Sequence, residues 1–105
     1  MGSERRIHPR TDTRLEATLS CAAGTIDGLV ENVGAGGVFF ATENLEVVVE
    51  EGGACTVAFS APSAEVSQPG QVLRCERYFD GSKVIRAFAI KFDGQLDVAS
   101  LGLGA

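Results

Sequence analysis

The chain has 105 residues and a formal net charge of −5 at pH 7, with 45% hydrophobic and 22% charged residues. This length fits one domain with a single core, and the composition is typical of a soluble globular protein. No apolar run approaches the roughly 18 residues of a membrane-spanning helix, and the charged opening residues lack a signal peptide's apolar segment. We therefore expect a cytoplasmic protein without membrane insertion. The acidic balance argues against a DNA- or RNA-binding surface.

Strand patterns begin at residue 15 and continue through the first half of the chain. Apolar and polar residues alternate strictly over residues 15–21, Ala22-Ala23-Gly24 is typical of a turn, and residues 25–32 predict a returning strand. Asp27-Gly28 is an alternative position for this hairpin turn. A glycine cluster follows, and then a strand over residues 38–42.

The second half of the chain predicts further strands. Residues 45–49 favour a barrel strand, with an edge strand or a partner surface as alternatives. A strand over 55–60 follows the turn at residues 51–53, and the small, polar residues 63–70, which include Pro69, predict a loop or a ragged connection. Residues 71–79 and 83–92 flank Asp80-Gly81-Ser82, which is the clearest hairpin signal. Only residues 95–101 indicate a short helix. Such closely spaced strands predict an all-β fold, a small antiparallel barrel or a sandwich.

Few residue types that support catalysis or metal binding come together in this sequence. The single histidine, His8, has no nucleophile or carboxylate in a recognisable arrangement with it. The three cysteines, Cys21, Cys55 and Cys75, are widely spaced among apolar residues and are interpreted as small buried side chains in a reducing compartment. We therefore expect no enzyme activity, no catalytic residue, no metal and no cofactor.

Two short segments carry the chemistry of a binding site. The first is R-R-I-H-P-R, in which Arg6 and Arg10 have the spacing R-x-x-x-R and Pro9 disfavours a helix. Arginine guanidinium groups bind phosphate oxygens and stack on aromatic rings, although a solvated N-terminal tail is the alternative interpretation. The second segment is N-V-G-A-G-G, Asn32 to Gly37. Its glycines permit positive φ and the close approach of a ligand to the backbone. The alternative interpretation is that they form only a bend at a barrel corner.

An R-x-x-x-R arm followed by a short polar residue and a glycine-rich turn between two strands resembles the PilZ domain family. The resemblance covers nearly the whole chain, including the apolar V-F-F after the glycines and the last strand R-A-F-A-I-K-F-D. It implies a six-stranded antiparallel β-barrel over residues 14–105 with at most a short C-terminal helix, preceded by a flexible arm over residues 1–13. It also implies a bacterial receptor for the second messenger cyclic di-GMP.

The resemblance implies the ligand-binding residues as well. They are Arg5, Arg6 and Arg10 of the arm, Asn32, and the glycines Gly34, Gly36 and Gly37. The arm is expected to fold over the dinucleotide and to change the surface that an unidentified effector protein recognises, in motility or exopolysaccharide regulation. The chain is expected to be a monomer or a homodimer.

Two departures from the family pattern leave an alternative open. Gly34 occupies the position where the family usually has serine, and one lost hydrogen bond weakens binding by a few-fold to roughly tenfold. The C-terminal segment is also short beside the helix of many family members. The alternative is a degenerate PilZ domain that acts as a protein-interaction adaptor without nucleotide binding.

Overall fold

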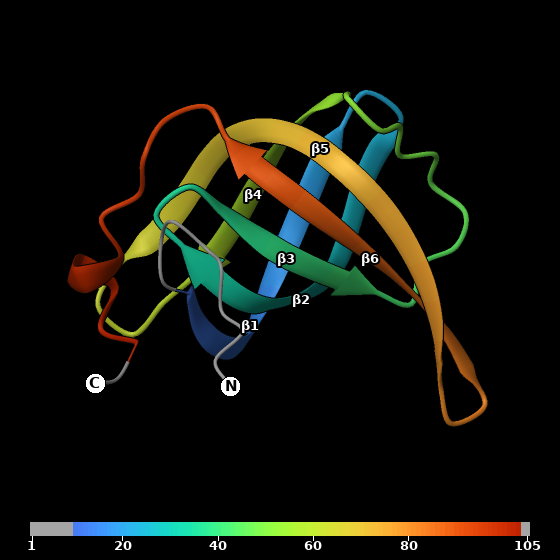
Figure 1. Ribbon diagram of the computed structural model, residues 1–105, viewed down its shortest axis with the longest axis horizontal. Helices are drawn as coiled ribbons and strands as arrows, with labels where there is room; N and C mark the ends of the chain where they lie inside the picture. The colour runs from blue at the N-terminus through green and yellow to red at the C-terminus, as the bar shows by residue number, and fades with distance from the viewer. Residues whose placement is uncertain (1–9, 104–105) are drawn as a thin grey trace, which may run out of the picture.

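The computed structural model describes residues 10–103, with side chains from residue 13 onward. Its six strands are β1 (Arg10–Cys21), β2 (Gly24–Gly34), β3 (Gly37–Thr42), β4 (Ala54–Ser60), β5 (Glu65–Asp80) and β6 (Lys83–Phe92), followed by a short 3-10 helix, η1 (Val98–Leu101). Neighbouring strands pair antiparallel in the order β1-β2-β3-β6-β5-β4, and β4 pairs with β1 to close the barrel (Figure 1). The predicted six-stranded antiparallel β-barrel is confirmed.

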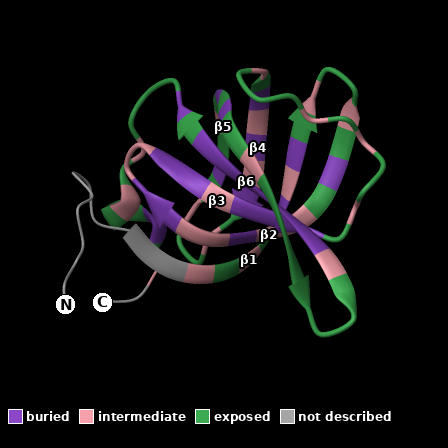
Figure 2. Cartoon of the chain, turned by 45° about the vertical axis from the view of Figure 1, so that its right-hand side comes forward, coloured by how far each residue is buried: buried purple, intermediate pink, exposed green. Residues whose placement is uncertain are grey.

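The barrel interior is filled by the apolar side chains that alternate along each strand. In β4 the buried residues Cys55, Val57 and Phe59 alternate with more exposed ones. Figure 2 colours the strands by burial and shows this alternation. Phe40 of β3 and Phe88 of β6 are fully buried, and their rings stack with centroids 6.3 Å apart. Leu101 of η1 is 1% exposed and belongs to the same core. The period-two pattern therefore located the core correctly.

Several predicted turns are confirmed by the pairing of the strands. Cys21 pairs with Gly24 around the turn that joins β1 to β2, and Asp80 pairs with Lys83 around the turn that joins β5 to β6. The second hairpin projects away from the barrel at the lower right of Figure 1. The short helix predicted near the C-terminus is η1, and Gly102 ends it in the left-handed conformation with φ 73°.

The alternative turn at Asp27-Gly28 is wrong, because both residues lie within β2. Gly28 pairs with Ala17 of β1, and a Cβ at this position would overlap the carbonyl oxygen of Ala41 in β3. This glycine therefore serves the close approach of two backbones inside the sheet and makes no turn.

The loop or ragged connection predicted over residues 63–70 is wrong from residue 65 onward, because β5 begins at Glu65 and continues through Pro69. Pro69 pairs with Thr56 of β4, while its carbonyl oxygen accepts a hydrogen bond from the Asp93 amide at 3.0 Å on the opposite side. The β5–β6 ladder begins only at Gly70. The missing amide hydrogen of Pro69 therefore falls beyond the end of that ladder, where a proline is tolerated.

The strand favoured over residues 45–49 does not form, and these residues lie in the irregular connection between β3 and β4. The Asn44 side chain accepts hydrogen bonds from the amides of Glu46 and Val47 at 2.9 and 3.0 Å, which curls the chain locally. Val47 and Val49 pack against the core while Leu45 and Val48 are exposed. Over residues 10–103 the structure contains no helix long and apolar enough to cross a membrane.

Candidate ligand-binding site

The start of β1 lies directly beside the glycine-rich hairpin that joins β2 to β3. The backbone of Arg10 pairs with Gly34, and the backbone of Asp12 pairs with Asn32. Strand β1 thus begins inside the segment that the sequence predicts as an arm, and it carries this segment to the glycine motif. Arg5 and Arg6 lie outside the described residues, as does the side chain of Arg10.

Asn32 lies where β2 departs from regular pairing on both of its sides. The register with β1 shifts between Asp12 and Leu15, and the register with β3 shifts between Val30 and Asn32. The Thr13 hydroxyl donates to the Val30 carbonyl oxygen at 2.7 Å and secures the chain at this irregularity. Such bulges re-aim side chains and often adjoin binding sites.

The hairpin turn at Ala35-Gly36 is tied to the C-terminal end of β6 and to the segment after it. The Phe92 amide donates to the Gly36 carbonyl oxygen at 2.8 Å, and the Leu96 amide donates to the Ala35 carbonyl oxygen at 2.8 Å. The carbonyl oxygens of both turn residues therefore already accept hydrogen bonds from backbone amides of the same chain.

Gly37 has a structural reason for being glycine that the sequence alone did not identify. A Cβ at this position would overlap the carbonyl oxygen of Ile90 in β6, with which β3 pairs. The left-handed φ expected of glycine occurs elsewhere, for example at Gly52 and Gly81. At Gly37 the absent side chain therefore brings β3 and β6 together.

A row of residues leads from Asn32 across the outer face of three further strands. Asn32 pairs with Phe39 of β3, Phe39 pairs with Ala89 of β6, and Ala89 pairs with Arg74 of β5. Ala89 alternates with the core residues Phe88 and Ile90, so this face points away from the interior. The row spans three strand spacings, about 14 Å. It places an amide, an aromatic ring, a small residue and a guanidinium group in one line.

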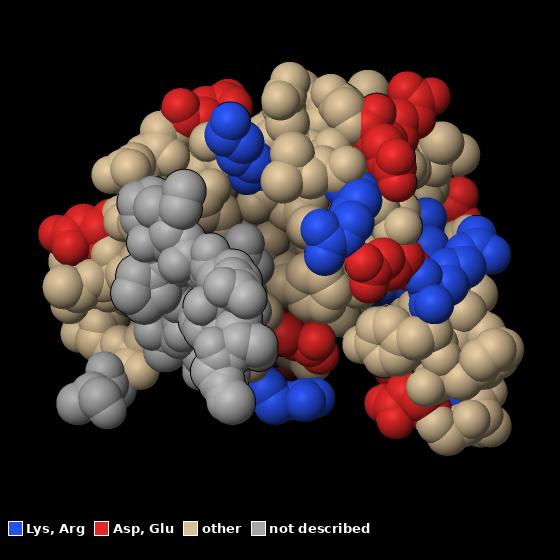
Figure 3. Space-filling view, viewed as in Figure 1, with Lys and Arg blue, Asp and Glu red and all other residues tan. Residues whose placement is uncertain are grey.

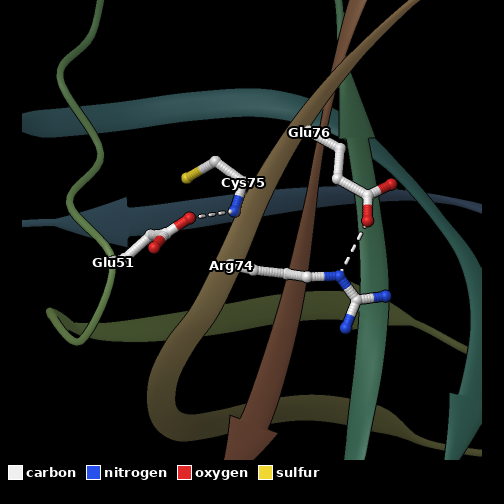
Figure 4. Close-up of polar contacts among 4 residues, drawn as sticks. All are labelled: Glu51, Arg74, Cys75 and Glu76. Atoms are coloured by element: carbon white, nitrogen blue, oxygen red, sulfur yellow. Dashed lines mark hydrogen bonds and ion pairs between the residues drawn. The ribbon is translucent and has the colours of Figure 1, made fainter.

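Sequence reasoning missed Phe39 and Arg74 as members of this outer row. Phe39 had a signal, since it alternates with the core residues Val38 and Phe40 and must therefore face outward. Arg74 had none, because its pairing with Ala89 depends on a register shift between Val72 and Arg74. The Arg74 guanidinium forms an exposed ion pair with Glu76 at 2.7 Å, with 59% of the Arg74 side chain accessible (Figure 4).

An open groove of about 1350 Å³ adjoins the row at Ala41 and Glu31 and reaches Tyr78 near the projecting hairpin. Its other charged lining residues are mostly acidic: Glu16, Asp27, Glu43, Glu65 and Asp80, with Arg14 as the exception. Burial, followed by the carboxylates of Glu31 and Asp80, raises the pKa of Tyr78, which reflects this negative surrounding. The acidic side chains of this groove repel a phosphate group, so an anionic ligand fits better at the end of the row that carries Arg74.

The face that Figure 3 presents carries lysine and arginine side chains interspersed with aspartate and glutamate, without a broad area of one sign. Among residues 10–103, no group of three or more histidine, cysteine, aspartate or glutamate side chains is placed to hold a metal ion.

Solved structures similar to this chain include two that bear on its fold. The inhibitor of motility MotI/DgrA of Bacillus subtilis superposes with a TM-score of 0.73 and 19% identity, covering 95% of this chain and 48% of that one. The PilZ domain of YcgR from Escherichia coli, determined with c-di-GMP, gives a TM-score of 0.70 and 14% identity, covering 86% and 79%. At these identities the likeness shows the fold, and the chain spans about half the length of MotI.

No curated protein matches the chain. The family model of the PilZ domain, however, matches residues 4–102, which is nearly the whole sequence. This match includes the arginine arm, the glycine-rich hairpin and all six strands of the closed barrel. The chain therefore belongs to the PilZ domain family.

Proposed function

We propose that this chain is a cytoplasmic receptor for cyclic di-GMP, which it holds between the N-terminal arginine arm and the glycine-rich hairpin. The observation that carries the proposal is the register of β1 on β2, which sets Arg10 opposite Gly34 and Asp12 opposite Asn32 in a PilZ-family chain. The two motifs, separate in the sequence, thus adjoin in the barrel.

The chemistry of the ligand suits the residues at this corner. Cyclic di-GMP presents two phosphates and two guanines, and the guanidinium groups of Arg5, Arg6 and Arg10 can bind phosphate oxygens or stack on a base. The Asn32 amide can both donate to and accept from a guanine edge. The backbone of Gly34 and Gly36 leaves space beside that edge. The role of Gly37 is then to hold the hairpin against β6.

The outer row extends this site beyond the residues of the motifs. The Phe39 ring offers a stacking surface next to Asn32, and Arg74 adds a cation at the far end of the row. Breaking the exposed Arg74–Glu76 ion pair costs little free energy, so Arg74 can turn toward a phosphate. We include Phe39 and Arg74 in the proposed site for these reasons.

Binding is proposed to signal without catalysis. Residues before Arg10 close over the dinucleotide, and the altered surface changes the affinity of an effector protein. The likeness to MotI, described as an inhibitor of motility, supports motility as the regulated process, and the c-di-GMP in the YcgR structure supports the identity of the ligand.

Titration calorimetry of the purified chain with cyclic di-GMP tests the proposal. We expect micromolar or tighter binding, and at least tenfold weaker binding by Arg10→Ala, because a charged hydrogen bond contributes about 1.5–3 kcal/mol. Arg14→Ala is the matched control, since it removes the same charge from an exposed position on the same strand. Equal losses in both variants, or no heat from folded wild-type protein, would contradict the proposal.

The specific observation that favours an adaptor without nucleotide binding is Gly34 at the family's serine position. Measuring cyclic di-GMP binding by wild type and by Gly34→Ser distinguishes the receptor from the adaptor. A receptor binds cyclic di-GMP as wild type and gains a few-fold in affinity from the added hydroxyl group. An adaptor shows no binding as wild type, and retains its effector protein in a pull-down when Arg10 is replaced.

A further inference from the structure

All three cysteines of the chain come together at one end of the barrel, beneath the connection between β3 and β4. The Cys21 thiol lies 3.8 Å from the Val48 carbonyl oxygen, and the Cys75 thiol lies 3.7 Å from the carbonyl oxygen of the next residue, Val49. Cys55 lies on β4 beside Cys21. This convergence is not visible in the sequence, where the cysteines are widely separated.

Cys21 and Cys55 are direct partners in the antiparallel ladder between β1 and β4. Cys21 also closes the two-residue turn to Gly24, so its backbone hydrogen-bonding groups point toward β2. Its pair with Cys55 on the other side is then of the non-hydrogen-bonded kind, with Cα atoms about 4.5 Å apart and side chains on one face. That separation lies within the range of disulfide-bonded cysteines.

Solvent reaches this pair through a groove of about 720 Å³. The groove is lined by both cysteines and by Val48, Val49, Glu50 and Asp93, among others. Cys21 is half-buried, whereas Cys55 is buried with 6% exposure. An oxidant therefore meets Cys21 first, and the two carboxylates on the groove wall favour a small neutral oxidant over an anionic one.

We propose that Cys21 and Cys55 form a dithiol modification site that hydrogen peroxide oxidises to a cross-strand disulfide. The Cys21 thiolate attacks one peroxide oxygen, the O–O bond breaks, and Cys21 sulfenic acid and hydroxide form. The Cys55 sulfur then attacks the Cys21 sulfur, the S–O bond breaks, and the hydroxyl group leaves with a proton as water. In total, two thiols are oxidised and one peroxide is reduced to two waters.

The surroundings of Cys55 agree with its role in the second step. Burial, followed by the nearby Cys21 and by Asp93, raises the pKa of Cys55 to about 11, so Cys55 stays protonated until the second step. Burial, followed by Glu51, whose carboxylate accepts from the Cys75 amide at 3.0 Å, raises the pKa of Cys75 as well (Figure 4). Cys75 pairs with Phe88, so it has no cysteine opposite it.

The experiment treats the purified full chain with hydrogen peroxide and maps its peptides without reduction. We expect a Cys21–Cys55 disulfide that lowers the mass by two hydrogen atoms, raises the thermal midpoint and disappears on reduction. Cys75→Ser is the matched control and should form the same disulfide. A Cys75-containing disulfide, a cross-link between two chains, or thiols that remain unchanged would overturn the proposal.

Trapping with dimedone tests the order of the two steps. In Cys55→Ala the Cys21 sulfenic acid has no partner and should accumulate as the dimedone adduct, whereas wild type should give little adduct. In Cys21→Ser, Cys55 should remain a thiol. Equal adduct on Cys21 in wild type and in Cys55→Ala would show that Cys55 does not resolve the sulfenic acid, and would contradict the proposal even if either variant were less stable.

Discussion

Arg86 lies at the barrel end as a buried cation that organises the connection between β3 and β4. It is 7% exposed; its Nε donates to the Asn44 carbonyl oxygen at 2.8 Å, and its Nη2 donates to that of Val47 at 2.9 Å. The guanidinium carbon lies 5.2 Å from the centre of the Phe88 ring. Burial, followed by the neighbouring Arg77, lowers the pKa of Arg86. Arg86 is thus a residue of strand β6 whose side chain stabilises the irregular connection between β3 and β4.

Replacing this arginine tests its structural role. Arg86→Met keeps the apolar stem but leaves the two carbonyl oxygens without their donor, so we expect a loss of about 2 kcal/mol in the free energy of unfolding. Lys83→Met is the matched control, because Lys83 pairs with Glu43 at 3.1 Å while both side chains are more than 60% exposed. It should change stability by less than about 0.5 kcal/mol. Urea denaturation measures both, and similar values would refute a special role for Arg86.

Pairing between elements, more than local sequence, decides where the candidate site lies. The chain from Arg10 to Asp12 follows β2 as far as Gly34, and the turn at Ala35-Gly36 is fastened to residues at and beyond the end of β6. Two stretches from opposite ends of the sequence therefore meet at one hairpin. This arrangement requires glycine at position 37, because the backbones of β3 and β6 approach there too closely for a side chain.

Alanine substitutions at two glycines separate close packing from turn flexibility. In Gly37→Ala the new methyl group meets the backbone of Ile90, which cannot move without breaking the ladder, and we expect a loss of about 1–3 kcal/mol. In Gly94→Ala the nearest atom is the Gln68 amide nitrogen at 3.8 Å, so stability should be unchanged or rise by about 0.5 kcal/mol. Thermal and urea unfolding provide the comparison. A tolerated Gly37→Ala would show that β3 and β6 can separate at this point.

At the scale of the whole molecule, burial of a titratable thiol couples folding to alkaline pH. The Cys55 thiol has an ordinary pKa of 9.0, and folding raises it to about 11. Between these values the folded chain keeps a proton that the unfolded chain has released. Stability from this group is therefore fully present below pH 9 and decreases as the pH rises toward 11.

Unfolding measured under reducing conditions between pH 8 and pH 11 tests this coupling. We expect wild type to lose up to about 2 kcal/mol more than Cys55→Ala over this interval, because alanine has no proton to release. Comparing slopes, not absolute stabilities, removes the constant effect of the missing sulfur atom. Parallel slopes would mean that Cys55 titrates normally in the folded chain.

The sequence by itself determined the class of fold and the position of most strands, because a chain buried on one face must alternate apolar and polar residues. It also identified the two motifs, since arginine spacing and a glycine cluster are local features. Two predictions from the sequence were wrong. Pro69 indicated a loop but lies in β5, where the ladder with β6 has not yet begun, and residues 45–49 indicated a strand although their valines pack against the core from a loop.

Only the tertiary structure decided what each local feature touches. The pairing of Arg10 with Gly34, of Ala89 with Arg74 and of Cys21 with Cys55 depends on barrel closure and on bulges that shift the register by one residue. Such contacts join residues far apart in the chain, and a single inserted residue moves every later side chain to the other face. For that physical reason the candidate site and the cysteine pair could be found only once the strands were placed in register.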